Sequence, residues 1–203
     1  MSKQRKPQLP KPPAGPSPTS EEASALAEAA LVRAARVRRL VSDGAQLLAA
    51  KQPGEAVVRL AEAWKLDPQN AAAAINLGGA YILQGKHERA VPVLEAATRL
   101  EPDNAMAWSN LAAAYLGRLP FATRERQDRA IATCERALAI DPRAPHVHYN
   151  PGLIYVERND PQRAATHFHA ALKTDPTDRN AQHWLGEIWR RGESASSDID
   201  QDA

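Results

Sequence analysis

The sequence has a single cysteine, Cys134, among its 203 residues, so no disulfide can form within the chain. It also lacks an apolar run of the roughly 18 residues that a membrane-spanning helix needs, and it has no recognisable signal peptide. Aromatic residues make up only 5%, and the formal net charge is only +2. A charge this small argues against a surface field that would attract nucleic acid or membrane. We therefore expect a cytoplasmic protein with no membrane partner.

Charged residues of one sign gather at each end of the chain. Residues 1–19 hold four basic residues, six prolines and no acid, whereas residues 193–203 hold four acids and no base. Neither end shows apolar periodicity, which predicts a disordered basic, Pro-rich tail over 1–19 and a disordered acidic tail over 193–203. The basic tail would add only weak contacts to phosphates. No basic stripe interleaved with aromatics accompanies it, so we do not expect a nucleic-acid partner.

The middle of the chain repeats itself. Four acid-proline pairs recur at spacings of 34, 40 and 34 residues: Asp67-Pro68, Glu101-Pro102, Asp141-Pro142 and Asp175-Pro176. Small residues recur between them in fixed positions, one set being Gly44, Gly78, Ala112 and Gly152 and another Ala56, Ala90, Ala130 and Ala164. A period of this length with small and aromatic positions is typical of a stack of helix–turn–helix units. Such arrays present a binding surface.

This pattern resembles that of the tetratricopeptide repeat (TPR) family over roughly residues 37–192. The second unit carries the family's residues almost position for position: Leu77, Gly78, Tyr81, Ala90, Leu94, Ala97 and Pro102. In the third unit Ala112 replaces the usual glycine, and Cys134 stands where other units have a large residue, so we interpret Cys134 as a small buried hydrophobe. The resemblance implies an all-α, right-handed superhelical solenoid of four TPR helix–turn–helix units, with a C-terminal capping helix and an N-terminal helical extension.

The repeat register divides the chain into successive segments. A helical extension over 20–36 leads into the array at 37–192, which comprises units at 37–70, 71–104, 105–144 (with an insertion) and 145–178 and a cap at 179–192. An unbroken apolar periodicity predicts one long helix over about 20–51, with Ser20 as its N-cap. We expect the first half of this helix to shield the open end of the stack.

Two units depart from the pattern. Six extra residues lie between Tyr115 and Ala130, and we expect 117–124 to bulge outward without adding stacking surface. The insertion is a possible second contact loop through Arg118, Phe121, Arg124 and Arg126; the alternative is a solvated turn whose phenylalanine packs on its own helices. In the fourth unit Pro151 predicts a first helix that is either kinked at Asn150 or begins near it.

In TPR proteins the first helix of each unit lines a concave groove. The register places Asn76, Asn110 and Asn150 at equivalent groove positions, where an amide can donate and accept hydrogen bonds with a peptide backbone. Asparagine is also common in the family at this position, so a structural role is the alternative. The neighbouring groove residues are apolar or small and comprise Ile75, Gly79, Ala113, Tyr149 and Leu153. We expect this groove to face solvent and to bind an extended or helical protein segment.

Other kinds of site find little support. The pairs His146/His148 and His167/His169 are spaced so that their side chains lie on different helix faces, and we expect no enzymatic activity, cofactor or metal site. TPR chaperone co-factors bind an acidic C-terminus through lysines and arginines, but the corresponding residues here are Val41, Ala45, Asn76, Met106 and Asn110. That partner is therefore disfavoured. The sequence predicts a protein-binding adaptor; the alternative is a self-assembling scaffold, a homo-oligomer whose groove is filled by another copy.

Overall fold

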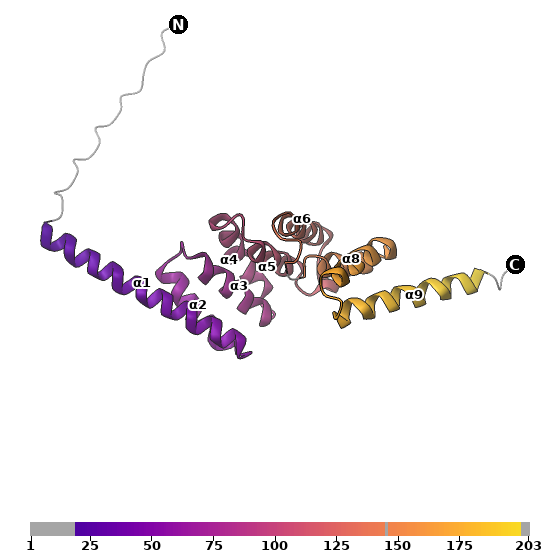
Figure 1. Ribbon diagram of the computed structural model, residues 1–203, viewed down its shortest axis with the longest axis horizontal. Helices are drawn as coiled ribbons and strands as arrows, with labels where there is room; N and C mark the ends of the chain where they lie inside the picture. The colour runs from indigo at the N-terminus through magenta and orange to yellow at the C-terminus, as the bar shows by residue number, and fades with distance from the viewer. Residues whose placement is uncertain (1–18, 145, 200–203) are drawn as a thin grey trace, which may run out of the picture.

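The computed structural model describes residues 19–144 and 146–199, and every regular element within these ranges is helical. The elements are α1 (Ser20–Ala49), α2 (Pro53–Leu66), α3 (Ala71–Leu83), α4 (His87–Leu100), α5 (Ala105–Leu116), η1 (Leu119–Phe121), α6 (Arg124–Ile140), α7 (Tyr149–Glu157), α8 (Pro161–Thr174) and α9 (Arg179–Ile199). Figure 1 shows them following one another along an elongated array, with α1 and α9 projecting from its two ends. The predicted all-α solenoid is confirmed.

The helices pack in consecutive pairs through small residues. α1 contacts α2, α3 contacts α4, α5 contacts α6 and α7 contacts α8. Ala56, Ala90, Ala130 and Ala164, the alanines of one repeat position, are fully buried at these contacts. Cys134 is buried as predicted, and burial raises the pKa of its thiol to about 12. Cys134 therefore acts as a packing residue, because the reactive thiolate does not form at neutral pH.

The N-terminal extension does not shield the stack as we expected. Every residue from Thr19 to Arg36 is exposed, including Leu26 at 65%, Leu31 at 70% and Val32 at 64%. The reason is length: α1 has 30 residues, or about 45 Å, whereas its partner α2 has 14, or about 21 Å. The N-cap is Thr19 and not Ser20, because Thr19 forms a reciprocal capping box with Glu22.

The first helix of the fourth unit is shortened. α7 begins at Tyr149, whereas the register of α3 and α5 predicts a start near residue 145. Pro151 lies in the first turn of α7, where no intrahelical hydrogen bond is lost. Just before the helix, His146 adopts a φ of +60°, in the left-handed region that disfavours helix continuation. Of the two predicted alternatives, a helix that begins near Asn150 is the one found.

The C-terminal helix is longer than predicted. α9 passes through Gly192, where we expected its end, and continues to Ile199. A single glycine costs a helix only about 1 kcal/mol relative to alanine, and no proline follows to end it. Residues 1–18 and 200–203 of the predicted tails lie outside the described residues. Across the described ranges, no helix combines the length and apolar character needed to span a bilayer.

Candidate functional site

The first helices of successive units share one face of the array. α3 contacts α1 on one side and α5 on the other, and α5 also contacts α7. Each second helix packs on its own first helix and on the first helix of the following unit. The candidate groove is therefore formed by α1, α3, α5 and α7.

Two of the three predicted groove asparagines are accessible. Asn76 on α3 and Asn110 on α5 are half-buried, and neither amide has a hydrogen-bond partner within the part of the chain that the structure describes. A Cβ atom built on Gly79 would lie 3.8 Å from Asn110 Nδ2, so the amide of α5 lies beside the bare backbone of α3. Leu83 is exposed and follows Asn76 by two helical turns on the same face.

One of the predicted apolar groove residues, Ile75, is less accessible than we expected. Ala113, Tyr149 and Leu153 are half-buried, whereas Ile75 is buried. Ile75 packs in a core cluster with Ala74, Ala97 and Ala107, so its side chain points between the helices and not into solvent. Small partners on α4 and α5 leave the space that this side chain fills.

Asn150, the third member of the ladder, is only 7% exposed. Its Nδ2 atom is buried and has no hydrogen-bond partner in the structure. Asn150 lies in the first turn of the shortened α7, whereas Asn76 and Asn110 lie in the middle of α3 and α5. Its neighbour Tyr149 packs against Phe168, with the ring centroids 5.7 Å apart. The accessible ladder therefore consists of Asn76 and Asn110.

The insertion of the third unit forms the short 3-10 helix η1 and presents Phe121 to solvent. Phe121 is 80% exposed, so the alternative in which this ring packs on its own helices is wrong. The guanidinium carbon of Arg118 lies 5.9 Å from the centroid of the Phe121 ring, in cation–π contact. Arg118 and Phe121 therefore form one exposed basic and aromatic tip.

Arg126 is a structural anchor and not a free loop arginine. Its Nε donates to the carbonyl of Tyr115 at 3.0 Å, and its Nη2 donates to that of Ala114 at 3.2 Å. Its Nη1 forms an ion pair with Glu88 on α4. Arg126 thus satisfies carbonyls at the C-terminal end of α5 and joins the insertion to the second unit.

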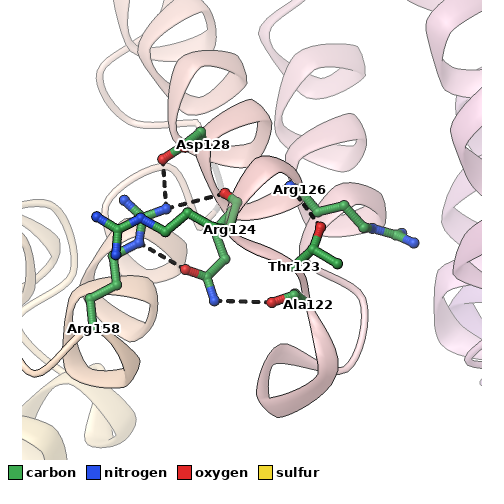
Figure 2. A network of polar contacts seen from close by, with 7 residues as sticks. Ala122, Thr123, Arg124, Arg126, Asp128 and Arg158 are labelled. Atoms are coloured by element: carbon green, nitrogen blue, oxygen red, sulfur yellow. Dashed lines mark hydrogen bonds and ion pairs between the residues drawn. The ribbon is translucent and has the colours of Figure 1, made fainter.

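A second arginine holds the other side of the insertion, as Figure 2 shows. Arg158, at the end of α7, donates to Gln127 Oε1 at 2.8 Å, to Asp128 Oδ1 at 2.6 Å and to the carbonyl of Arg124 at 3.4 Å. Gln127 in turn donates to the carbonyl of Ala122 at 3.2 Å. Arg124 therefore contributes its backbone here, while its side chain is exposed.

The insertion also adds packing surface, contrary to our expectation. Leu119 packs against the core cluster of Leu116, Ala130 and Ile154, and η1 contacts α7. The short helix turns this leucine inward while its neighbours face solvent. Sequence spacing alone gave no signal for this inward residue.

Between the insertion and the second unit lies a pocket of about 480 Å³. It is lined by Gly85–Arg89, the turn and first residues of α4, and by Leu116–Arg118, Phe121, Ala122 and Arg126. The contribution of Lys86 and His87 was not predicted from the sequence. Repeat stacking offered a signal, because the turn of one unit lies next to the turn of the following one.

Within the described ranges, no group of three or more His, Cys, Asp or Glu side chains is placed to hold a metal ion. The three histidines with shifted pKa values are His87, His148 and His167. Burial is the first cause that lowers each of these pKa values.

Comparisons with known structures agree with this geometry. MamA (residues 41 to the end) from Desulfovibrio magneticus RS-1 is 25% identical, with a TM-score of 0.59 over 70% of this chain and 77% of that one. Pseudomonas aeruginosa pilF is 18% identical, with a TM-score of 0.66 over 80% and 71%. The first TPR domain of Spaghetti (RPAP3), bound to an HSP90 peptide, is 22% identical, with a TM-score of 0.54 over 61% and 95%.

Sequence comparisons are consistent with the structural ones. No curated protein sequence matches the chain significantly. Two tetratricopeptide repeat models match, one over residues 47–115 and the other over 118–183, which together account for more than half of the chain. Together they span the helices from α2 to α8. The chain belongs to the tetratricopeptide repeat family.

Proposed function

We propose that the protein is an adaptor that binds an extended or helical segment of another protein in the groove of α1, α3 and α5. The observation that carries this proposal is the pair Asn76 and Asn110, two half-buried residues whose amides have no intramolecular partner among the described residues. Each amide can donate and accept a hydrogen bond, as a peptide backbone requires. The bare backbone at Gly79 gives a ligand room beside Asn110, and the exposed Leu83 offers an apolar contact.

The burial of Asn150 refines this proposal. A ligand that uses the asparagine ladder contacts α3 and α5, and it meets the fourth unit only through the half-buried Tyr149 and Leu153. The accessible asparagines come from two repeat units and not from the three that we predicted. We therefore expect the ligand segment to be short. The interaction is proposed to occur in the cytoplasm, a location that remains a prediction of the sequence.

The groove also favours a class of ligand. The RPAP3 structure holds an HSP90 peptide, but the positions of this chain that correspond to a chaperone clamp lack cations: Val41, Ala45, Asn76, Met106 and Asn110. A free carboxylate would lose its hydration there without gaining an ionic partner. An uncharged segment with apolar anchors fits this groove better than an acidic C-terminus.

The test is a pull-down with three baits: the wild type, the double variant Asn76→Ala/Asn110→Ala, and the control Gln162→Ala. Gln162 is an exposed amide on α8, a second helix outside the groove. We expect a groove partner to be retained by the wild type and by the control. Its affinity for the double variant should fall about tenfold to a hundredfold, because each lost hydrogen bond costs about 0.5–1.5 kcal/mol. Equal binding of a purified partner to all three baits would overturn the proposal.

Self-assembly is a second candidate function, favoured by the exposed apolar side chains of Leu26, Leu31 and Val32 on the α1 extension. Exposed apolar surface of this kind commonly marks a contact site. If the extension of one copy fills the groove of another, the mean mass measured by light scattering rises with concentration. Replacing Leu26 and Leu31 by Gln, and separately the two groove asparagines by Ala, must then lower it. A constant monomer mass excludes this function.

A further inference from the structure

The pocket beside the insertion has an excess of positive charge. Its lining includes Lys86, Arg89, Arg118 and Arg126, against the single acid Glu88. Arg126 is paired with Glu88. In the described part of the chain, Lys86, Arg89 and Arg118 have no acidic partner in the structure. Three cations therefore remain uncompensated around one concave site, while the groove has none of the clamp cations.

The same pocket carries unsatisfied and apolar groups. Phe121 lies at the edge of the pocket and is 80% exposed. The Nδ1 atom of His87 is buried in the structure and has no hydrogen-bond partner. Burial and the charges of Arg126 and Arg118 lower the pKa of His87, so this ring is neutral at neutral pH and adds no fourth charge. The exposed ring of Phe121 therefore offers an apolar contact directly beside the cations.

The backbone adds to the preference for an anion. α4, which has 14 residues, starts at this pocket, and the side chain of its N-cap residue, Lys86, makes no capping hydrogen bond. The N-terminal end of a helix carries a partial positive charge, which here adds to that of the three side chains. Gly117, with a φ of +55°, lies beside His87 and allows the chain to turn tightly into the insertion.

We propose that this pocket is a second peptide site, which binds an acidic segment of a partner protein through carboxylates on Lys86, Arg89 and Arg118 and through an aromatic or large aliphatic side chain on Phe121. Charge complementarity fixes the sign of the ligand, and the exposed ring next to the cations fixes its apolar anchor. A volume of about 480 Å³ accommodates one such side chain with its flanking carboxylates. The adaptor then has two sites of different chemistry, an uncharged groove and a basic pocket.

A peptide is a better ligand for this pocket than a nucleic acid. A single-stranded nucleic acid needs a series of aromatic rings for successive bases along a basic track. Among the residues that line the pocket, Phe121 is the exposed aromatic ring, and it already contacts Arg118 at 5.9 Å; the ring of His87 is half-buried. A second copy of the chain would need an acidic segment to reach this pocket. Self-association of the full chain would reveal such binding.

The experiment measures fluorescence anisotropy of three labelled peptides with the full chain at low salt. The probes are Gly-Asp-Asp-Phe-Asp-Asp-Gly, the same peptide with Ala in place of Phe, and the same peptide with Lys in place of every Asp. We expect the acidic Phe peptide to bind best, the Ala peptide to bind more weakly and the basic peptide not to bind. Raising the salt concentration should weaken binding, because the contacts are ionic.

Variants then assign the binding to the pocket. Phe121→Ala should remove the difference between the Phe and Ala peptides, and Lys86→Glu with Arg118→Glu should weaken the acidic peptide about tenfold or more. The same double variant should gain binding to the basic peptide, an effect that mere loss of structure cannot produce. Circular dichroism checks folding; Phe121 and Arg118 are exposed, so we expect it to be unchanged.

The groove variant Asn76→Ala/Asn110→Ala separates the two sites. It should bind the acidic peptide like the wild type, so failure of the groove proposal leaves this one intact. Four results would overturn the second site: equal binding of the basic and acidic peptides, no effect of the pocket variants, displacement of the acidic peptide by a ten-residue oligothymidylate at equal concentration, or self-association of the full chain that Phe121→Ala abolishes.

Discussion

A methyl group added to Gly78 on α3 would overlap Leu94 on α4: an ideal Cβ atom would lie 2.3 Å from Leu94 Cγ. Because Leu94 is fully buried, it cannot move aside without disturbing its own neighbours. We expect Gly78→Ala to destabilise the protein by about 1–3 kcal/mol, the usual cost of overpacking, in spite of the better helix propensity of alanine. Urea denaturation followed by circular dichroism measures this change.

The next residue in the same helix is a matched control. A Cβ atom on Gly79 would meet only Asn110 Nδ2, at an ordinary contact distance of 3.8 Å. Gly79→Ala should therefore stabilise the protein by up to about 1 kcal/mol through helix propensity alone. If the two adjacent substitutions change stability in the same direction, steric contact at Gly78 is not what selects glycine there.

The third unit solves the same packing problem with different residues. Three units pair a glycine with a large side chain, Gly44 with Leu60, Gly78 with Leu94 and Gly152 with Phe168, and an added Cβ would approach within 2.4, 2.3 and 2.7 Å respectively. In the third unit Ala112 and Cys134 occupy the equivalent positions, and both are buried. A larger residue on the first helix is thus accompanied by a smaller one on the second.

This relation predicts a specific coupling between two substitutions. Cys134→Leu alone should cost about 1–3 kcal/mol by overpacking against Ala112. Adding Ala112→Gly should recover most of that loss, because the double variant recreates the pair found at Gly78 and Leu94. A double-mutant cycle measured by urea denaturation should give a favourable coupling of about 0.5–3 kcal/mol. Strict additivity would show that the two positions do not pack on each other.

The repeat periodicity made the helices predictable, because each acid-proline pair and each buried alanine occupies a fixed place in the unit. The packing of Cys134 followed from its position alone. The start of α7 could not be predicted in this way, because the repeat register places Asn150 in the middle of a helix and the structure places it in the first turn. That start reflects the left-handed conformation at His146 and the placement of Pro151 in the first turn.

The insertion was predictable in position and not in conformation. Counting residues located it, but the inward packing of Leu119 and the roles of Arg126 and Arg158 arise from contacts with other units. Arg158 comes from the end of α7, which is 31 residues from its acceptor Gln127. Contacts of this range leave no mark on local sequence patterns. These contacts also fix the conformation of the insertion, so the exposure of Phe121 became clear only in the structure.

Arg158 should be essential for holding the insertion (Figure 2). Its side chain is only 11% exposed, and Gln127, one of its acceptors, is buried. Arg158→Met keeps the aliphatic bulk but leaves the side-chain oxygen of Gln127, Oε1, without a hydrogen-bond donor. This loss should cost about 1–3 kcal/mol. Arg158→Lys should lie between this variant and the wild type, because lysine cannot donate to three acceptors in a fixed plane. Thermal melting measures the loss, at about 2–4 °C per kcal/mol for a chain of this size.

An exposed arginine provides the comparison. Arg163 pairs with Asp160 at 3.3 Å, but its side chain is 68% exposed. Its guanidinium carbon also lies 5.4 Å from the centroid of the Tyr155 ring. Because the side chain is exposed, Arg163→Met should change stability by no more than about 1 kcal/mol. Limited proteolysis should also show faster cleavage within 119–123 for Arg158→Met and not for Arg163→Met. Equal melting temperatures for the two variants would contradict a special role for Arg158.

Acid should destabilise the fourth unit through two neighbouring histidines. The rings of His148 and His167 have centroids 6.4 Å apart, and His167 also stacks on Tyr155 at 5.4 Å. Burial lowers the pKa of His148, and burial followed by the charge of His148 lowers the pKa of His167. The folded state therefore binds protons less readily than the unfolded state, whose histidines titrate near pH 6.5.

Because the unfolded state binds more protons in this range, stability rises with pH there. The contribution of these two histidines to the free energy of unfolding should be constant above the ordinary histidine pKa and fall as the pH drops below about 6.5. His167→Gln removes one of the two groups and relieves the other of its charged neighbour, so the fall in melting temperature between pH 7.5 and pH 5 should be smaller than in the wild type. His169→Gln, which changes an exposed histidine of the same helix, is the matched control. If melting curves of His167→Gln and the wild type lose stability equally on acidification, the pair does not account for the acid sensitivity.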